Sequence, residues 1–195
     1  MTTTPEIAAA PLRKKNAHVW ERDEHDFYVE PRWTSQRLFE AERFYGDVWD
    51  PACGTGRIVM SARGAGLTAF GTDLVDRGFP GAGACNFLKE TGRVDCIITN
   101  PPFKHARAFV EQALKLMTRR SAFLLPTSWL NGDRRSRWLE TTPLVKVWVL
   151  TPRPSMPPGR LIEAGMEPGQ GRVDFSWFVF DVNAAGPPTV GWLRR

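Results

Sequence analysis

The stretch Asp50-Pro51-Ala52-Cys53-Gly54-Thr55-Gly56 connects a short apolar segment to a run with helical spacing, and it decides the fold class. Residues 47–53 have the length and apolar character of a strand, and residues 57–63 have the spacing of a helix. Glycines at such a turn let the backbone pass close to a ligand, and the helix that follows offers free N–H groups. A tight turn in which the glycines serve only the backbone conformation is the alternative.

Strands and helices alternate on both sides of this turn. The predicted strands are residues 47–53, 68–74, 94–99, 121–125, 144–150 and 173–182, with a weaker one before residue 86, and the predicted helices are residues 34–44, 57–63, 106–117 and 133–140. Most of the strands are near-continuous apolar runs, which are typical of an α/β fold with a mostly parallel sheet. Residues 152–172, rich in Pro and Gly, lack such periodicity, and we expect this long loop to be functional.

Composition indicates a single globular domain of modest positive charge. The chain has 195 residues, of which 42% are hydrophobic and 24% charged, and this excludes a wholly disordered or fibrous protein. Lys and Arg number 26 against 21 Asp and Glu, and the resulting net charge of +5 favours an anionic partner. We expect residues 1–17 to form a flexible polar leader and residues 18–195 to form one domain.

The cysteines and histidines are spaced too widely for a zinc site, so no metal is expected. Cys53, Cys85 and Cys96 form no C-x-x-C pair, and the three histidines lie far apart. The odd cysteine count and the lack of a recognisable signal sequence predict a reduced, cytoplasmic setting. No apolar run is long enough to span a membrane, so a membrane is not an expected partner.

Asp73 strengthens the case for a ligand at the first turn. It lies 17 residues after Gly56, at the end of the next predicted strand. An acidic side chain at this place can accept hydrogen bonds from both hydroxyls of a ribose. The third glycine of the pyrophosphate fingerprint is missing, and Arg57 follows Gly56 directly. The sequence therefore predicts a pocket for a nucleoside without a diphosphate.

A second motif, Asn100-Pro101-Pro102-Phe103, directly follows the buried strand at residues 94–99. Its two prolines fix the backbone and remove two N–H donors, so the Asn100 side chain and the Pro101 carbonyl are held at the end of the strand. A rigid turn that only ends the strand is the alternative. Because this motif comes after the D-P-A-C-G-T-G turn, on a neighbouring strand of the predicted sheet, we favour a functional site.

Together, D-P-A-C-G-T-G at 50–56 and N-P-P-F at 100–103 resemble motifs I and IV of the S-adenosylmethionine-dependent amino-methyltransferases, chiefly the N6-adenine DNA methyltransferases. The resemblance covers about residues 27–182. It implies a Rossmann-like class I methyltransferase, with a mostly parallel, doubly wound sheet that ends in an antiparallel strand, and S-adenosylmethionine as the cofactor. After the second motif no separate target-recognition domain remains.

The resemblance also implies a set of cofactor-binding residues. The F-Y-V-E-P stretch at 27–31 is similar to the short motif that contacts the methionine end of the cofactor, and Asp50, Ala52 and Gly54 would line the methionine and sulfonium part. Asn86 stands where the family usually has an Asp that accepts a hydrogen bond from the cofactor's adenine, and its amide oxygen can still accept one. The full set is Tyr28, Pro31, Asp50, Ala52, Cys53, Gly54, Gly56, Asp73, Leu74, Asn86 and Phe87.

The expected catalytic residues are Asn100, Pro101, Pro102 and Phe103. The N6 nitrogen of adenine is a poor nucleophile because its lone pair is delocalised into the ring. If the Asn100 side-chain oxygen and the Pro101 carbonyl accept its two hydrogens, the lone pair can face the methyl group, and attack is a direct displacement without a strong base. Phe103 would stack on a base flipped out of the duplex, or else it is a core aromatic.

The expected nucleic-acid contacts come from two places. Arg134, Arg135 and Arg137 begin the helix that follows the strand at 121–125, Arg153 lies in the long loop after the strand at 144–150, and Trp129 borders the proposed site. The arginines would bind phosphates at the carboxyl-end rim of the sheet, and Trp129 could stack on a base. A solvated charged face is the alternative for the arginines.

The sequence therefore predicts a methyltransferase that acts on the N6 amino group of adenine in DNA. The same N-P-P-F chemistry also serves RNA adenine and protein glutamine-amide methyltransferases, with DNA favoured over RNA. A non-catalytic, methyltransferase-like subunit that binds nucleic acid is the rival of another class. The small size leaves room for a recognition partner or a homodimer.

Overall fold

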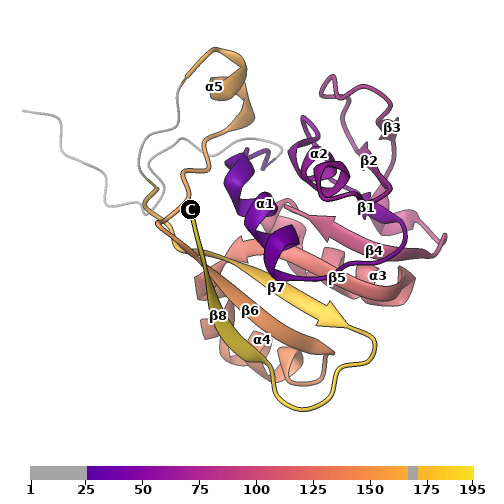
Figure 1. Ribbon diagram of the computed structural model, residues 1–195, viewed down its shortest axis with the longest axis vertical. Helices are drawn as coiled ribbons and strands as arrows, with labels where there is room; N and C mark the ends of the chain where they lie inside the picture. The colour runs from indigo at the N-terminus through magenta and orange to yellow at the C-terminus, as the bar shows by residue number, and fades with distance from the viewer. Residues whose placement is uncertain (1–25, 167–170) are drawn as a thin grey trace, which may run out of the picture.

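One eight-stranded sheet runs through the computed structural model, which describes residues 26–166 and 171–195 (Figure 1). The strands lie in the order β3-β2-β1-β4-β5-β7-β6-β8. They are β1 Val48–Asp50, β2 Ala69–Asp73, β3 Gly83–Ala84, β4 Val94–Thr99, β5 Met117–Pro126, β6 Leu144–Thr151, β7 Phe175–Asp181 and β8 Thr189–Arg194. Neighbours from β3 to β5 are parallel, β7 is antiparallel to both β5 and β6, and β8 is parallel to β6.

Helices cover both faces of the sheet, with α1 and α2 in front of it and α3 and α4 behind it in Figure 1. The helices are α1 Arg32–Ala41, α2 Arg57–Gly64, α3 Ala106–Leu116, α4 Asp133–Leu139 and α5 Gly159–Glu163, and the 3-10 turns are η1 Phe87–Lys89, η2 Phe103–His105 and η3 Thr127–Asn131. On β4, Ile98 packs into the core under α1 and α2, and Ile97 packs into the core under α3. This alternation along a strand buried on both faces explains its continuous apolar run.

The predicted α/β fold with a mostly parallel sheet is confirmed. The expected antiparallel strand is β7, and one further strand, β8, follows it. β8 was not predicted because it lies at the edge of the sheet, where Val190 and Trp192 are exposed and the apolar pattern is weak. The Pro- and Gly-rich loop at 152–172 contains the short helix α5 within its described part. The leader predicted for residues 1–17 lies outside the described residues.

The order of the strands brings the sequence motifs to one edge of the sheet. β1 ends at Asp50, β2 ends at Asp73, and β4 ends one residue before Asn100. Because these three strands are parallel neighbours, their carboxyl ends meet, which is where ligands bind in doubly wound sheets. Among the described residues, no helix is long and apolar enough to cross a membrane.

Candidate functional site

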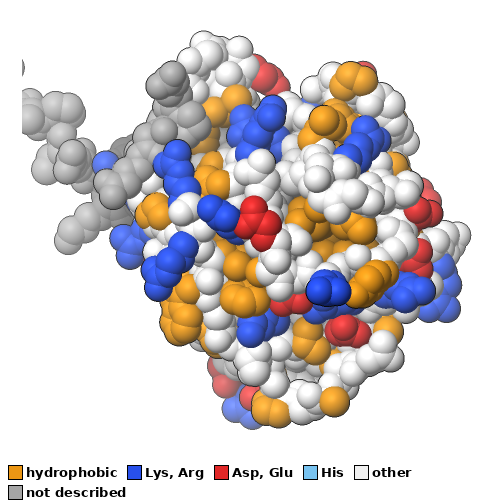
Figure 2. Space-filling view, viewed as in Figure 1, with side chains coloured by type: hydrophobic (Ala, Val, Ile, Leu, Met, Phe, Trp, Pro, Cys, Tyr) orange, Lys and Arg blue, Asp and Glu red, His pale blue; other side chains and the backbone are white. Residues whose placement is uncertain are grey.

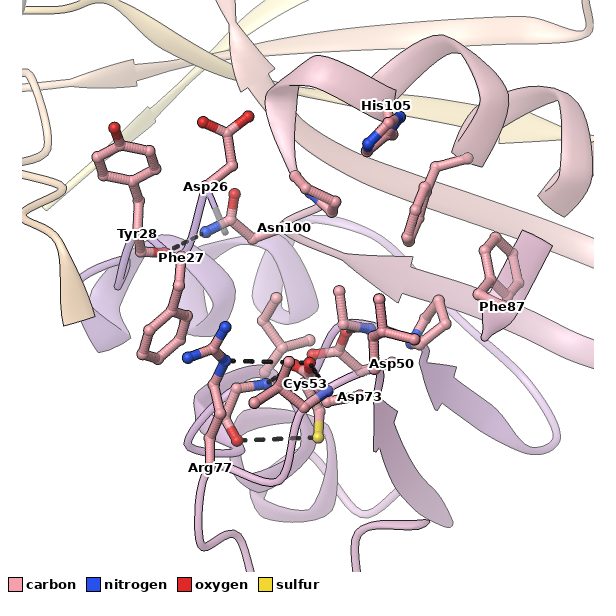
Figure 3. A pocket seen from close by; sticks show the side chains of 18 of the residues that line it. Asp26, Phe27, Tyr28, Asp50, Cys53, Asp73, Arg77, Phe87, Asn100 and His105 are labelled. Atoms are coloured by element: carbon pink, nitrogen blue, oxygen red, sulfur yellow. Dashed lines mark hydrogen bonds and ion pairs between the residues drawn. The ribbon is translucent and has the colours of Figure 1, made fainter. Parts of the chain in front are cut away.

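A cavity of about 450 Å³ lies at this edge of the sheet (Figure 3). Its walls come from the segment before α1, the turn after β1, the loop after β2, and the Asn100 motif after β4. The predicted site residues that line it are Tyr28, Asp50, Ala52, Cys53, Gly54, Asp73, Leu74, Asn86, Phe87, Asn100 and Pro102. Pro31, Gly56, Pro101 and Phe103 are not among the residues that line it.

The turn after β1 is shaped by its two glycines. Gly54 has φ +51° and Gly56 has φ +79°, a left-handed conformation that side chains rarely adopt. The N–H of Gly54 donates to Asp73 Oδ2 at 2.9 Å, and the N–H of Val75 donates to Asp73 Oδ1 at 3.1 Å. The carboxylate of Asp73 is therefore held in place, and each of its oxygens keeps a lone pair for a further donor.

Asp50 is buried at the centre of an acidic group. It is 1% exposed, and its Oδ1 accepts the N–H of Ala52 at 3.2 Å. Burial raises the pKa of Asp50 well above its ordinary value, and the carboxylates of Glu30 and Asp73 act in the same direction. Arg77 Nε lies 3.9 Å from Asp73 Oδ1 and offsets part of this repulsion, and a positively charged ligand would offset the remainder.

Asn100 presents an unused acceptor. Its Nδ2 donates to the backbone oxygen of Tyr28 at 2.8 Å and to Glu30 Oε2 at 2.9 Å. Its Oδ1 is buried and has no hydrogen-bond partner among the described residues. A buried acceptor without a donor is costly, and such atoms often belong to a binding site. This atom can accept an N–H from a ligand.

The segment before α1 connects the two motifs. Asp26 Oδ2 accepts the N–H of Lys104 at 2.9 Å, and the ring of Tyr28 stacks on Phe103 with centroids 5.6 Å apart. The ring of Phe27 packs against Gly54, where an added Cβ would lie 2.6 Å from Phe27 Cε2. The segment therefore contacts both the turn after β1 and the Asn100 motif, and Figure 3 shows Asp26 and Tyr28 beside Asn100 and the ring of Phe27 next to Arg77.

The sequence alone predicts no individual role for Phe27, Glu30 or Arg77, which all lie in this region. Phe27 packs under the guanidinium of Arg77, which lies 3.9 Å from the ring centroid, and Glu30 pairs with Asn100. Glu30 could have been suspected, because a charged residue followed by Pro31 in an otherwise apolar stretch needs a partner. Nothing in the local pattern signals the contacts of Phe27 and Arg77.

An apolar slot lies at the other end of the cavity. Leu74 and Leu88 are 67% and 39% exposed, and Phe87 forms a buried wall beside them. The Oδ1 of Asn86 accepts the N–H of Leu88 at 3.2 Å and so caps η1, and one of its lone pairs remains. Exposed leucines beside a polar amide fit a flat ring with a hydrogen-bonding edge.

Cys53 is not a nucleophile. Burial, followed by the charges of Asp50 and Asp73, raises the pKa of the Cys53 thiol to about 12, so it stays protonated. Burial also raises the pKa of Cys85. Within residues 26–166 and 171–195, no cluster of His, Cys, Asp and Glu could hold a metal ion.

The predicted nucleic-acid residues are largely engaged within the fold. Arg135 lies over the ring of Trp129 at 5.0 Å and donates to its backbone oxygen, and Arg137 and Arg153 form ion pairs with acidic neighbours. Arg134 is exposed. On the side of the molecule in view, Figure 2 shows the Lys and Arg side chains of the described residues scattered among apolar and acidic ones.

The prediction that Trp129 stacks on a base is wrong. Trp129 is only 7% exposed, and its ring packs edge-on against Phe178 of β7 and against Trp138 of α4. The 3-10 turn η3 directs this side chain inward, so it completes the core under α4. No ring face is left for a base.

Comparisons with known proteins give the fold. No family model matches the chain, and no curated protein matches its sequence. Among solved structures, the EcoKI M protein of a type I restriction enzyme is similar, with a TM-score of 0.59 and 17% identity, over 87% of this chain and 49% of that one. A protein assigned as the modification subunit of a type I restriction enzyme from Vibrio vulnificus YJ016 has a TM-score of 0.55 and 20% identity, over 83% of this chain and 45% of that one.

A third similar structure is a protein from Pyrococcus horikoshii assigned as an RNA methyltransferase, with a TM-score of 0.54 and 17% identity, over 77% of this chain and 81% of that one. These likenesses show that the chain has the class I methyltransferase fold. The chain spans about half the length of the two modification subunits.

Proposed function

We propose that the chain transfers a methyl group from S-adenosylmethionine to the N6 amino group of adenine in DNA. The main support for the proposal is that Asn100, which lines the cavity, has a buried Oδ1 that accepts no hydrogen bond from the described residues. An amino group that donates to this atom would lie beside the acidic end of the cavity, where a sulfonium is favoured. The fold, shared with type I modification subunits, supports the same conclusion.

The residues of the cavity fit the cofactor. Asp73 has a free lone pair on each oxygen for a ribose hydroxyl, Asp50 and Glu30 supply negative charge for the methionine end, and Leu74 and Leu88 form a slot for the adenine. The volume of about 450 Å³ is within the range of ordinary small-molecule sites. When bound, S-adenosylmethionine supplies an electrophilic methyl group on a positively charged sulfur.

The acceptor amine is activated by position rather than by a base. Asn100 Oδ1 and the carbonyl oxygen of Pro101 accept the two hydrogens of the amine, which directs the nitrogen lone pair into the cavity. As the nitrogen–carbon bond forms, the bond from that carbon to sulfur breaks, and the methylated amine then releases one proton to solvent. Water leaves the site when the base enters, and these hydrogen bonds then become stronger.

The aromatic pair beside Asn100 would hold the base. Tyr28 lines the cavity and Phe103 does not. The ring of Tyr28 stacks on that of Phe103 at an interplanar angle of 16°. A flipped base would therefore contact Tyr28, with Phe103 supporting it from behind, and would gain about 1–3 kcal/mol from stacking. This differs from direct stacking on Phe103.

DNA recognition would need more than the described surface. Exposed Arg134 follows the carboxyl end of β5, at the same edge of the sheet as the cavity, and is the best candidate for a phosphate contact. The EcoKI M protein and the Vibrio vulnificus modification subunit belong to type I restriction enzymes, and we propose that a recognition partner or a second copy supplies sequence specificity here. We expect the protein to act in the cytoplasm.

A transfer assay with labelled S-adenosylmethionine tests the proposal on duplex DNA, structured RNA and protein. We expect label in duplex DNA, and none when Asn100 is replaced by Ala, while calorimetry shows that the Asn100→Ala variant still binds the cofactor. Label in RNA would favour the second candidate, which is supported by the likeness to the RNA methyltransferase over 81% of its length. Failure of the wild-type chain to bind the cofactor would favour a non-catalytic subunit.

A further inference from the structure

Glu30 is a buried carboxyl group whose contact with Asn100 the proposed chemistry does not yet use. It is 7% exposed, lies two residues before α1, and its Oε2 accepts from Asn100 Nδ2 at 2.9 Å. Its backbone oxygen accepts a hydrogen bond from Arg57 Nη1 at 2.7 Å. Burial raises the pKa of Glu30, because removing its carboxylate from water is unfavourable. A costly buried group in direct contact with the central side chain of a site requires a reason.

The hydrogen bonds around Asn100 give that reason. A primary amide has two N–H donors on one side and one oxygen on the other, and rotation by half a turn exchanges them. Tyr28 O and Glu30 Oε2 are both acceptors, and each receives one N–H of the amide. The rotated amide would place Oδ1 against two acceptors and lose both hydrogen bonds. Only one orientation is therefore favourable, and it leaves Oδ1 unpartnered.

We propose that Glu30 is a positioning residue for methyl transfer, which holds the Asn100 amide so that Oδ1 faces the acceptor amine. This inference rests on the proposed function. The backbone oxygen of Tyr28 accepts one N–H of that amide, and the carboxylate of Glu30 accepts the other. Its hydrogen bond also draws electron density toward Oδ1 and makes that oxygen a better acceptor.

Asp26 provides an instructive contrast on the same segment. Its carboxylate accepts the backbone N–H of Lys104, so it anchors the turn after Asn100. Glu30, by contrast, binds the Asn100 amide directly. Orientation of the amide thus depends on Glu30 and on the backbone of Tyr28.

Two variants of similar size separate the hydrogen bond from packing. Glu30→Met removes the acceptor, and Glu30→Gln keeps an oxygen that can accept from Asn100 Nδ2. We expect Glu30→Met to lower the single-turnover rate by about 10–100-fold at saturating cofactor and DNA, the loss typical of one charge-assisted hydrogen bond. Glu30→Gln should recover most of this loss, and because both variants remove the same charge from the cavity, the cofactor dissociation constant should rise by a similar factor in both.

A control variant shows whether lowered stability alone slows the reaction. Glu42 is a partly buried carboxylate that does not line the cavity and that binds Arg120 Nη2 at 2.8 Å and Trp148 Nε1 at 2.7 Å. Glu42→Met should lower the melting temperature and leave the single-turnover rate unchanged. If Glu30→Met transfers methyl groups at the wild-type rate, or if Glu30→Gln is slowed as much as Glu30→Met, the positioning role is refuted.

The side-chain amide of Asn100 gives a readout that is independent of activity. In a nitrogen-15 NMR spectrum, this signal is the one that Asn100→Ala removes. We expect both of its protons to be shifted downfield and protected from exchange in the wild type, and one of them to lose its shift and protection in Glu30→Met but not in Glu30→Gln. An unchanged amide in Glu30→Met overturns the inference, whereas a wild-type chain that transfers no methyl group contradicts the proposed function itself.

Discussion

Replacing Asp50 with Asn should make the fold more stable and the cofactor complex weaker. Asn has nearly the same shape as Asp, and its oxygen can still accept the N–H of Ala52. What the change removes is a negative charge that is 1% exposed and faces the carboxylates of Glu30 and Asp73. The substitution therefore isolates the free-energy cost of placing that charge in the cavity.

The sign of the stability effect follows from the raised pKa of Asp50. A carboxyl whose pKa is higher in the folded than in the unfolded chain binds more protons in the folded state, so stability falls as pH rises between the two values. Above the folded pKa, the whole penalty is present. The stability of Asp50→Asn does not decline in this way. Relative to the wild type, its free energy of unfolding should be higher by about 1.4 kcal/mol for each tenfold decrease in the acid dissociation constant of Asp50 on folding. For a chain of this size that is a rise of about 3–6 °C in melting temperature per tenfold.

Cofactor binding should change in the opposite direction. The loss of one charged contact with the cationic ligand costs about 1.5–3 kcal/mol, which is roughly a 10–150-fold weaker complex. Thermal unfolding from mildly acidic to neutral pH and titration calorimetry with S-adenosylmethionine measure the two effects. An Asp50→Asn variant that is less stable than the wild type at neutral pH, or that binds the cofactor equally well, would refute the reasoning.

Three further predictions concern other parts of the molecule. Gly159→Ala should lower stability by about 1–3 kcal/mol in a thermal unfolding experiment, since its Cβ would collide with the ring of Phe27, whereas Gly64→Ala, with open space around its Cβ, should be tolerated. Cys53 should resist iodoacetamide in the folded protein at mildly alkaline pH, because its thiol has a pKa of about 12, and rapid modification seen by mass spectrometry would be inconsistent with the buried turn. Arg134→Ala should weaken DNA binding and reduce the slope of log affinity against log salt by about one, and an unchanged slope would place the phosphate contacts elsewhere.

The main elements of the site could be predicted from the sequence because they follow from local rules. Glycines after an apolar strand mark a tight turn, and the parallel arrangement of β1, β2 and β4 brings the ends of those strands together. Asp50, Asp73 and Asn100 thus lie at one cavity although they are far apart in the chain. None of these placements requires knowledge of individual side-chain contacts.

The remaining features depend on contacts between distant segments. The bond between Glu30 and Asn100 joins residues 70 positions apart, and the packing of Phe27 against Gly159 depends on the path of the long loop after β6. Trp129 has the residue type and the sequence position expected of a base-stacking residue. Its side chain instead points into the core, where it packs against Phe178. Periodicity gives the type of an element, but it does not give the rotation of a short 3-10 turn.

Adenine methylation in DNA from cells that express the protein tests the central claim most directly. The DNA is digested to nucleosides, and N6-methyl-2′-deoxyadenosine is measured by mass spectrometry against cells that express the Asn100→Ala variant. The proposed function predicts N6-methyladenine in the DNA of cells with the wild-type chain and background levels with the variant, at equal amounts of folded protein. Equal methylation in both, or none in either while RNA adenine is methylated, would contradict it.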